Sequence, residues 1–430
     1  MNCVLDSTAA QGRITGARLN IWQLAIILSK VETWPYYVSA LAVELTKGEQ
    51  EHIVIKGTNN IEAYDAFLKG QEHYLRLVPE DFAKAIRYYE KATELDPNYS
   101  RAYAALAQAY WVGSGMGLHR IKDFGVPWDE QRLRASYYLE KAMEKPTTIA
   151  HAIASDMLLY MRQHEEAIAE AERAVALDPN APESLHAMSK ALIFGGRPEE
   201  AIILLKRAMR LDPRSVGMSL FELGFAQLYM GQLEEAADFL KRSVTHNPET
   251  RSFWQLLAVA YALSGREEEA RAMLKKYPGA PDLKGLMNFL PFRDMEIADR
   301  FADGLIKAGL PGKPSGYYKV YKEHQLSEEE IKKTFLGRSM TGFDDQEWSI
   351  ACNKDGKAAF RYGDTYYNGK WWLDNNSFCV QFKNVMGGLK DCSYLYSNPE
   401  GTSEKKSEYL MMNYYGLFPF SMADWRYYQI

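Results

Sequence analysis

A helix-sized unit recurs in the middle of the chain with a period of 34 or 35 residues. Pro179, Pro213 and Pro248 end the similar strings ALDP, RLDP and HNP. Before each proline, small and apolar residues fall every three or four positions, which is the period of an α-helix. Alanines recur at the same interval, at Ala167, Ala201, Ala236 and Ala270. Such a repeat predicts helix pairs that stack into a solenoid.

The spacing within each unit resembles the tetratricopeptide repeat, whose pattern is W-x2-L-G-x2-Y, then A-x3-F, then P. The last unit matches it with Trp254, Leu257, Tyr261, Ala270 and Leu274. The fold class that follows is a multidomain α + β chain. It has an α-solenoid of tetratricopeptide repeats followed by a small antiparallel, barrel-like β domain.

The chain divides into five expected parts. They are an N-terminal helical lead-in over 1–60, a solenoid of about six repeats over 61–280 with a looped insertion near 111–130, capping helices over 281–311, a linker and short helix over 312–334, and an antiparallel β domain over 335–430. Glycines at 312 and 316 mark the linker. Ser327 and Glu330 have the spacing of a capping box, which predicts the start of the short helix.

The composition changes at Phe335. Of the last 96 residues 21 are aromatic, against 13% for the whole chain, and short alternating runs replace the helical pattern. The expected strands are WSIAC, KAAFRY, GKWWL, SFCVQF, CSYLYS and EYLMMNYY, beginning at Trp348, Lys357, Gly369, Ser377, Cys392 and Glu408. The short turns between them favour an antiparallel meander, closed or half closed into a barrel.

The functional surface of a solenoid is its concave side, which the first helix of each pair forms. The repeat family's groove positions correspond here to His186, Lys190, Phe194, Phe221, Phe225, Tyr229 and Gln255. This mixed, partly aromatic set differs from the Lys/Asn clamp with which chaperone-binding members hold a peptide carboxylate. It predicts a protein or peptide partner in the groove, with packing against a neighbouring domain as the alternative for the aromatic side chains.

The β domain offers two further candidate sites. Trp371 and Trp372 should point to opposite faces of one strand, so that one packs in the core while the other lines an opening for a small ligand. Cys379 and Cys392 are expected on neighbouring strands, where they form either a disulfide or two buried thiols. All eight histidines precede Phe335, so the domain has no imidazole for general-base catalysis.

Composition and motifs exclude several other functions. The formal net charge of −5 gives no general attraction to nucleic acid or anionic lipid. No P-loop, zinc-protease or nucleophile-elbow motif is present, so we expect neither a metal nor another cofactor. The apolar run from Ile21 to Ser29 is too short to span a bilayer and favours a buried helix face. Without an export signal the expected location is cytoplasmic, or periplasmic if the start is truncated.

A second resemblance concerns a larger assembly. Residues 45–110, with KGTNNIEAYDAFLKG and RAYAALAQAYW, resemble the repeat region of bacterial adenylate/guanylate cyclase-like proteins, and residues 281–310 resemble its end. The β domain, with GKWW, FCVQF and YSNPEG, is similar to one that follows some such arrays. In those proteins a class III cyclase domain precedes the repeats, and the residues before Ile21 are too few to form one.

The expected function is therefore a non-enzymatic interaction scaffold or adaptor in bacterial signalling. One alternative is a regulatory subunit or truncated relative of a class III nucleotide cyclase, with a cyclase as its partner. Another is a small-ligand receptor that acts through the C-terminal β domain.

Overall fold

The computed structural model describes residues 57–76, 78–116, 118, 121, 124–213, 216–276, 282–313, 316–343, 347–383, 385, 388–399 and 407–424. The expected lead-in over 1–60 lies outside the described residues, apart from 57–60. Residues 58–430 form one compact unit, and the following description concerns that unit.

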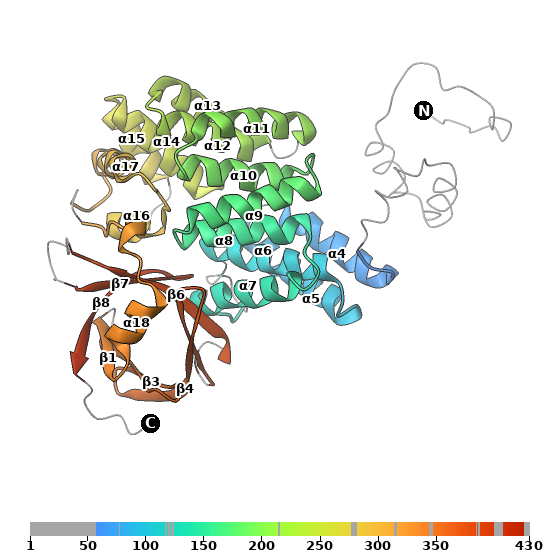
Figure 1. Ribbon diagram of the computed structural model, residues 1–430. Helices are drawn as coiled ribbons and strands as arrows, with labels where there is room; N and C mark the ends of the chain where they lie inside the picture. The colour runs from blue at the N-terminus through green and yellow to red at the C-terminus, as the bar shows by residue number, and fades with distance from the viewer. Residues whose placement is uncertain are drawn as a thin grey trace, which may run out of the picture. The chain divides into compact units, whose positions relative to one another are not determined.

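Helices from Ile61 to Lys275 form six consecutive pairs that stack along the chain (Figure 1). The pairs are α4 (Ile61–Tyr74) with α5 (Pro79–Leu95), α6 (Ser100–Met116) with α7 (Trp128–Ala142), α8 (Thr148–Tyr160) with α9 (His164–Leu177), α10 (Pro182–Phe194) with α11 (Pro198–Leu211), α12 (Val216–Tyr229) with α13 (Leu233–His246), and α14 (Arg251–Leu263) with α15 (Glu267–Lys275). The predicted solenoid is confirmed.

The recurring alanines are the points at which the two helices of a pair approach closely. Ala167, Ala201, Ala236 and Ala270 are all fully buried. In the fifth pair Gly224 faces the same contact, because a Cβ there would lie 2.5 Å from Leu240 Cγ. Each second helix also begins with acidic residues, whose negative charge stabilises the helix N-terminus.

The loop within the insertion near 111–130 is shorter than the sequence predicts. Helix α6 continues to Met116 and α7 already begins at Trp128, so both ends of the expected loop are helical. The glycines of this stretch misled the prediction, because Gly113 lies inside α6 at a close contact. A Cβ there would be 2.9 Å from Leu118 Cδ2. Packing therefore favours glycine within this helix.

Two helices follow the last pair. Helix α16 spans Leu283–Phe289, and α17, Met295–Lys307, packs on α14. Phe301 and Leu305 of α17 are buried there. Gly304 permits the close approach, since a Cβ would lie 2.8 Å from Val259 Cγ1.

Residues 338–424 form a closed antiparallel barrel whose eight strands follow chain order. The strands are β1 (Arg338–Phe343), β2 (Glu347–Cys352), β3 (Lys357–Tyr362), β4 (Thr365–Asp374), β5 (Ser377–Phe382), β6 (Lys390–Ser397), β7 (Tyr409–Asn413) and β8 (Gly416–Asp424). Pairing of β1 with β8 closes the ring, with Gly342 opposite Phe420. The predicted barrel is confirmed.

Two strands were missing from the sequence prediction. Only two residues separate β1, which begins at Arg338, from the helix before it. The single glycine between them, Gly337, is too short a turn signal to mark the start of a strand. β8 contains Pro419, which argues against a central strand. Its ladder with β1 begins only at Phe420, so the proline lies where β8 pairs with β7 alone. The expected strand EYLMMNYY also ends early, at Asn413, because Tyr414 and Tyr415 form the turn into β8.

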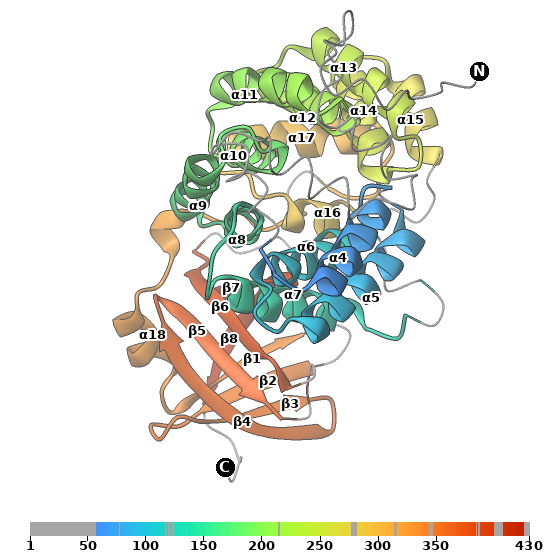
Figure 2. The ribbon, with the colours of Figure 1, turned by 90° about the vertical axis from the view of Figure 1, so that its right-hand side faces the viewer.

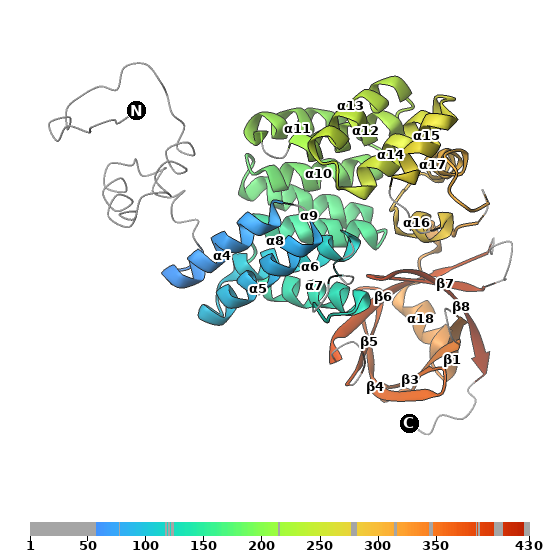
Figure 3. The same cartoon turned by 180° about the vertical axis from the view of Figure 1, so that it is seen from behind.

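Helix α18, Glu328–Phe335, covers one end of the barrel, as the side view shows (Figure 2). Along the barrel axis it lies within the ring of strands (Figure 3). Ser327 and Glu330 form the predicted capping box. Ile331 and Phe335 enter the barrel core, where the Phe335 ring lies 5.8 Å from that of Phe420. Helix α18 therefore fills one end of the barrel with apolar side chains.

The outer face of the barrel packs on the solenoid. Tyr396, Leu410 and Met412 form an apolar cluster with Met161 of the α8–α9 turn. The turn between β7 and β8 contacts two tryptophans of the second repeat. Tyr414 lies 6.2 Å from the Trp111 ring and Tyr415 6.4 Å from the Trp128 ring. The β domain is therefore held against the first half of the repeats.

Candidate functional site

The first helices α6, α8, α10, α12 and α14 contact one another in series and form the concave face of the solenoid. The predicted groove residues lie on three of these helices. His186, Lys190 and Phe194 are on α10, Phe221, Phe225 and Tyr229 on α12, and Gln255 on α14. The charged residues His186 and Lys190 form ion pairs between helices, whereas most of the aromatic residues pack against another segment of the chain.

Charged side chains from α8, α10 and α12 form a polar strip, which we define as Asp156, His186, Lys190 and Glu222. The ammonium nitrogen of Lys190 lies 2.9 Å from each carboxylate oxygen of Asp156. His186 Nδ1 lies 2.7 Å from Glu222 Oε2. Lys190 keeps 32% of its side chain exposed, which makes it the most accessible member of the strip. Each ion pair joins the first helices of adjacent repeats.

Electrostatics in the polar strip favours the charged forms. Burial lowers the pKa of His186, but the nearby Glu222 carboxylate outweighs this effect and the pKa is raised overall. Burial likewise opposes the charge of Lys190, whereas the Asp156 and Glu222 carboxylates raise its pKa above the ordinary value. The neighbouring carboxylates therefore favour the cationic forms of His186 and Lys190.

His186 also contacts a serine, which raises the question of catalysis. Ser219 Oγ lies 3.3 Å from His186 Nε2, so Ser219, His186 and Glu222 have the connectivity of a serine-hydrolase triad. The Ser219 side chain, however, is fully buried on α12. A nucleophile must reach its substrate, so this arrangement supports packing between α10 and α12 rather than acyl transfer.

Three of the four aromatic residues of the predicted groove, Phe194, Phe225 and Tyr229, are covered by the chain itself, which corrects the expectation of an open surface. Phe225 is only 7% exposed. Its ring lies 4.9 Å from that of Phe194 and 6.0 Å from that of Phe292, in the segment between α16 and α17. Tyr229 is buried in the same region. These side chains pack against a neighbouring segment, which was the alternative.

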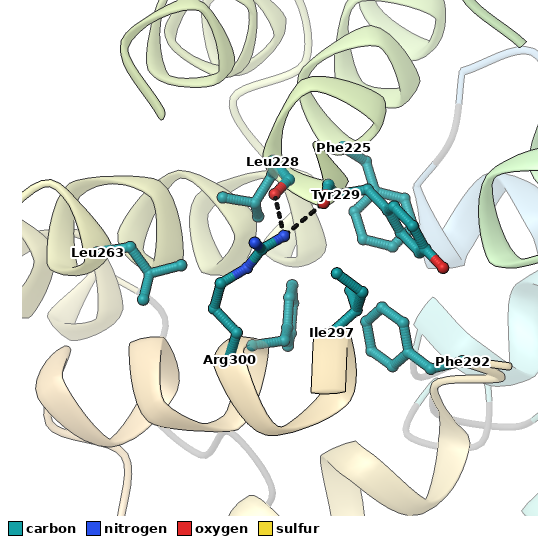
Figure 4. Close-up of a pocket in the computed structure, with 8 residues that line it drawn as sticks. Phe225, Leu228, Tyr229, Leu263, Phe292, Ile297 and Arg300 are labelled. Atoms are coloured by element: carbon teal, nitrogen blue, oxygen red, sulfur yellow. Dashed lines mark hydrogen bonds between the residues drawn. The ribbon is translucent and has the colours of Figure 1, made fainter. Parts of the chain in front are cut away.

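Arg300 of α17 fastens this cover to α12. Its guanidinium donates hydrogen bonds to the carbonyl oxygens of Leu228, at 3.1 Å, and Tyr229 (Figure 4). A cation at the last carbonyls of a helix also compensates the negative end of the helix dipole. Around it, Phe225, Ile297 and Phe292 line a small apolar pocket. This half of the concave face is thus closed by α17 and the residues before it.

The two remaining groove residues differ from each other. Phe221 is half-buried and stacks on Phe253 with ring centres 4.4 Å apart. Gln255 is half-buried on α14, and its amide nitrogen has no hydrogen-bond partner among the described residues. The Gln255 amide nitrogen is itself buried, so it offers no accessible donor to the groove.

The candidate ligand residues of the barrel lie on opposite faces of β4. Trp371 packs in the barrel core, where its ring lies 6.0 Å from Phe378 and its Nε1 donates to the Asn353 carbonyl at 2.8 Å. Trp372 pairs with Cys379 across the outer face, and Lys370 Nζ lies 5.4 Å from its ring centre. Trp371 is thus occupied by core contacts, while a ligand role for Trp372 stays a prediction.

Cys379 and Cys392 lie directly opposite each other on β5 and β6 and are joined by a disulfide. Of the two expected forms, a disulfide or two buried thiols, the structure contains the disulfide. Within the described residues Cys352 is a free, buried thiol, and burial raises its pKa. It lies in the barrel core, away from the disulfide on the outer face.

The described part of the chain contains neither a candidate metal site nor a helix able to span a membrane. There, no group of three or more His, Cys, Asp or Glu side chains is arranged to hold a metal ion. Among the helices in the same residues, none combines the length and apolar character needed to cross a bilayer.

Comparison with known proteins supports the repeat assignment. One family model described as tetratricopeptide repeat matches residues 158–216 and 227–282, and another with the same description matches residues 80–99. Together with the helix pairs, these matches define the class of protein: a tetratricopeptide-repeat solenoid followed by an eight-stranded β-barrel. Repeats of this type typically serve as protein–protein interaction scaffolds.

Several solved structures are similar to part of this chain. TTC0263, a tetratricopeptide-repeat protein of Thermus thermophilus, is 21% identical over 41% of this chain and 91% of its own, with a TM-score of 0.32. YrrB, described as having an unusual peptide-binding site, is 22% identical over 39% of this chain and 79% of its own, with a TM-score of 0.26. The Cut9–Hcn1 structure is 15% identical over 66% of this chain and 50% of its own, with a TM-score of 0.41. No curated protein matches the chain.

The sequence prediction missed the turn between α8 and α9. Arg162 stands where the corresponding turns of the next three repeats have Gly196, Gly231 and Gly265, and all four residues have positive φ. An arginine in place of a recurring turn glycine was a signal available in the sequence.

Proposed function

We propose that this chain is a non-enzymatic interaction scaffold that binds an extended segment of a partner protein on the concave face, at the polar strip. The carrying observation is that α17 and the preceding segment cover the aromatic half of the predicted groove, whereas Lys190 keeps 32% of its side chain exposed. Lys190 and His186 offer positive charge, while Asp156 and Glu222 offer acceptors. The chemistry suits a polar peptide with charges of both signs.

The test is affinity capture of the intact protein from its native lysate, compared with a Lys190→Ala variant. Loss of the ammonium group should lower partner recovery at least tenfold. Lys206→Ala is the matched control, because Lys206 is an exposed lysine on α11, a second helix, outside the concave face. Equal recovery by Lys190→Ala and by the unaltered protein, with both variants folded, would contradict the proposed site.

Two narrower hypotheses remain open to direct tests. Regulation of a nucleotide cyclase predicts that the purified chain changes the output of a cyclase catalytic domain, although the matches above concern the repeats and include no cyclase. A small-ligand receptor in the barrel predicts quenching of Trp372 fluorescence by a metabolite. Such a ligand would bind the outer face of the barrel, because Ile331 and Phe335 of α18 fill one end of its interior.

A further inference from the structure

The turn between α8 and α9 has an unusual residue at its left-handed position. Arg162 has φ 62°, whereas Gly196, Gly231 and Gly265 at the corresponding turns have φ 86°, 79° and 80°. Glycine adopts this conformation without steric cost, but any residue with a Cβ is strained there. Glycine would give this turn a lower conformational energy, so contacts of the arginine side chain must offset the strain.

The Arg162 side chain is directed toward the segment after α16. Its guanidinium donates hydrogen bonds to the carbonyl oxygens of Leu290 and, at 3.3 Å, Asn288. His164 Nε2 lies 2.8 Å from the Pro291 carbonyl oxygen, so the imidazole donates there as well. Arg162 is only 6% exposed, yet its Nε has no hydrogen-bond partner among the described residues. A buried donor without a partner is rare and calls for an explanation.

Arg162 also lines a pocket between four parts of the chain. We call the space between them the junction pocket, and it contains about 310 Å³ of unfilled space including its opening to solvent. It is lined by Arg162 from the α8–α9 turn, His164 and Glu165 from the start of α9, Arg293 from the segment before α17, Val320 and Lys322 from the linker, and Tyr396 from β6.

Positive charge dominates this lining. Arg162, Arg293 and Lys322 supply three cations, and Glu165 supplies one carboxylate, which pairs with Arg293 at 2.8 Å. Glu166 lies outside the lining, 3.8 Å from Lys322 Nζ. The pocket also lies at the N-terminus of α9, where Gln163 provides no side-chain cap for the first backbone N–H groups. With both carboxylates counted, one positive charge remains uncompensated, and this charge beside several donors suits an anion.

We propose that the junction pocket binds a phosphate group, supplied by inorganic phosphate or by a small phosphate monoester. The Arg293 guanidinium and the Lys322 ammonium would donate to its oxygens, and the buried Arg162 side chain would add positive charge at the pocket wall. A phosphate group offers three acceptor oxygens to the cations of the pocket, whereas a carboxylate offers two. Because the pocket is lined by the solenoid, the segment before α17, the linker and the barrel, the ligand would hold all four together.

The experiment is thermal unfolding of the full chain in sodium phosphate, glycerol 3-phosphate, sodium acetate or sodium chloride at equal ionic strength. Binding to the native state should raise the unfolding temperature in phosphate above that in chloride. An additional increase in glycerol 3-phosphate would identify a monoester as the better ligand, and an increase in inorganic phosphate alone would identify the free ion. Equal temperatures in phosphate, acetate and chloride would overturn the proposal.

Three variants locate the effect. Arg162→Gly restores the glycine of the other turns and should abolish the phosphate-dependent increase. Lys322→Met removes a half-exposed cation without creating a buried cavity, so it should fold and lose at least half of the increase. Arg197→Gln is the control, because Arg197 is an exposed cation at the corresponding α10–α11 turn. A phosphate effect that is unchanged in Lys322→Met would contradict the assignment even if Arg162→Gly failed to fold.

Discussion

At the scale of single residues, two kinds of side chain determine how the repeat helices pack and what they bind within the chain. Small residues such as Ala236 and Gly224 set the distance between paired helices, since both lie at contacts with no space for a larger group. Polar residues at one turn, Arg162, Gln163 and His164, bind parts of the chain more than a hundred residues away. The first kind recurs along the repeats, whereas the second belongs to the turn of the third repeat.

Enlarging a close-packed alanine should separate a helix pair. Ala236→Leu adds three carbon atoms to a fully buried position and should destabilise the protein by about 1–3 kcal/mol, the usual cost of overpacking. Ala176→Leu is the control on an exposed position of α9 and should change stability by less than about 0.5 kcal/mol. Urea unfolding measures both, and equal midpoints would refute the close contact.

His164 should make stability depend on pH. Burial, the largest cause, lowers the pKa of His164 to about 4, below its ordinary value of 6.5. Between these values the unfolded chain binds a proton that the folded protein does not, so stability falls as the pH falls. The loss between about pH 7.5 and about pH 5 should be about 2 kcal/mol.

The variant His164→Gln tests that origin. Glutamine keeps a donor for the Pro291 carbonyl but does not titrate, so the dependence of the free energy of unfolding on pH should become shallower by about the same 2 kcal/mol. Urea unfolding at the two pH values measures the slope. If the variant retains the full dependence, other groups are responsible for it.

At the scale of elements, local patterns were sufficient where neighbours in sequence are neighbours in space. The helix pairs, the α18 capping box and six of the barrel strands follow from periodicity, turn residues and alternation. The cover over Phe225 does not, because Phe292 finds its place through contacts with α10 and α12 that no local pattern encodes. The sequence therefore predicted groove residues that include aromatic side chains which the chain buries itself.

Removing Phe292 should loosen the cover over the groove. Its ring is almost fully buried and contacts Phe194, Phe225 and Phe301 at centre distances of 5.3 to 6.0 Å. Phe292→Ala should therefore cost about 3–5 kcal/mol. Ile203→Ala, at an exposed position on α11, should cost less than about 0.5 kcal/mol. Chemical denaturation compares them, and a small effect of Phe292→Ala would mean that the segment does not close the groove.

At the scale of the whole molecule, the α8–α9 turn connects parts that would otherwise be separate. Gln163 donates to the Tyr396 hydroxyl on the barrel at 3.0 Å and accepts from Lys322 in the linker. Arg162 and His164 bind the segment after α16. The apolar cluster of Met161 with Tyr396 and Leu410 adds burial to these hydrogen bonds. The barrel and the groove cover thus depend on the same turn.

Gln163→Ala should weaken barrel docking without changing the repeats. It leaves the buried Tyr396 hydroxyl without its donor, which should cost about 1–3 kcal/mol. Amide hydrogen exchange should then become faster in β6 and in the linker around Lys322. Gln232→Ala is the matched control, since Gln232 occupies the corresponding turn before α13 and is exposed. Similar exchange in both variants would show that the turn does not hold the barrel.

The central claim is that a partner binds the polar strip and not the covered aromatic residues. Site-specific photo-cross-linking in the native lysate tests it directly, with the reactive group placed at Glu183, Tyr229 or Lys206. Glu183 lies on α10 on the same face as His186 and Lys190, Tyr229 lies under the cover, and Lys206 lies on α11. The account predicts a partner adduct at Glu183 and none at Tyr229 or Lys206. Adducts of equal yield at Tyr229, or only at Lys206, would contradict it.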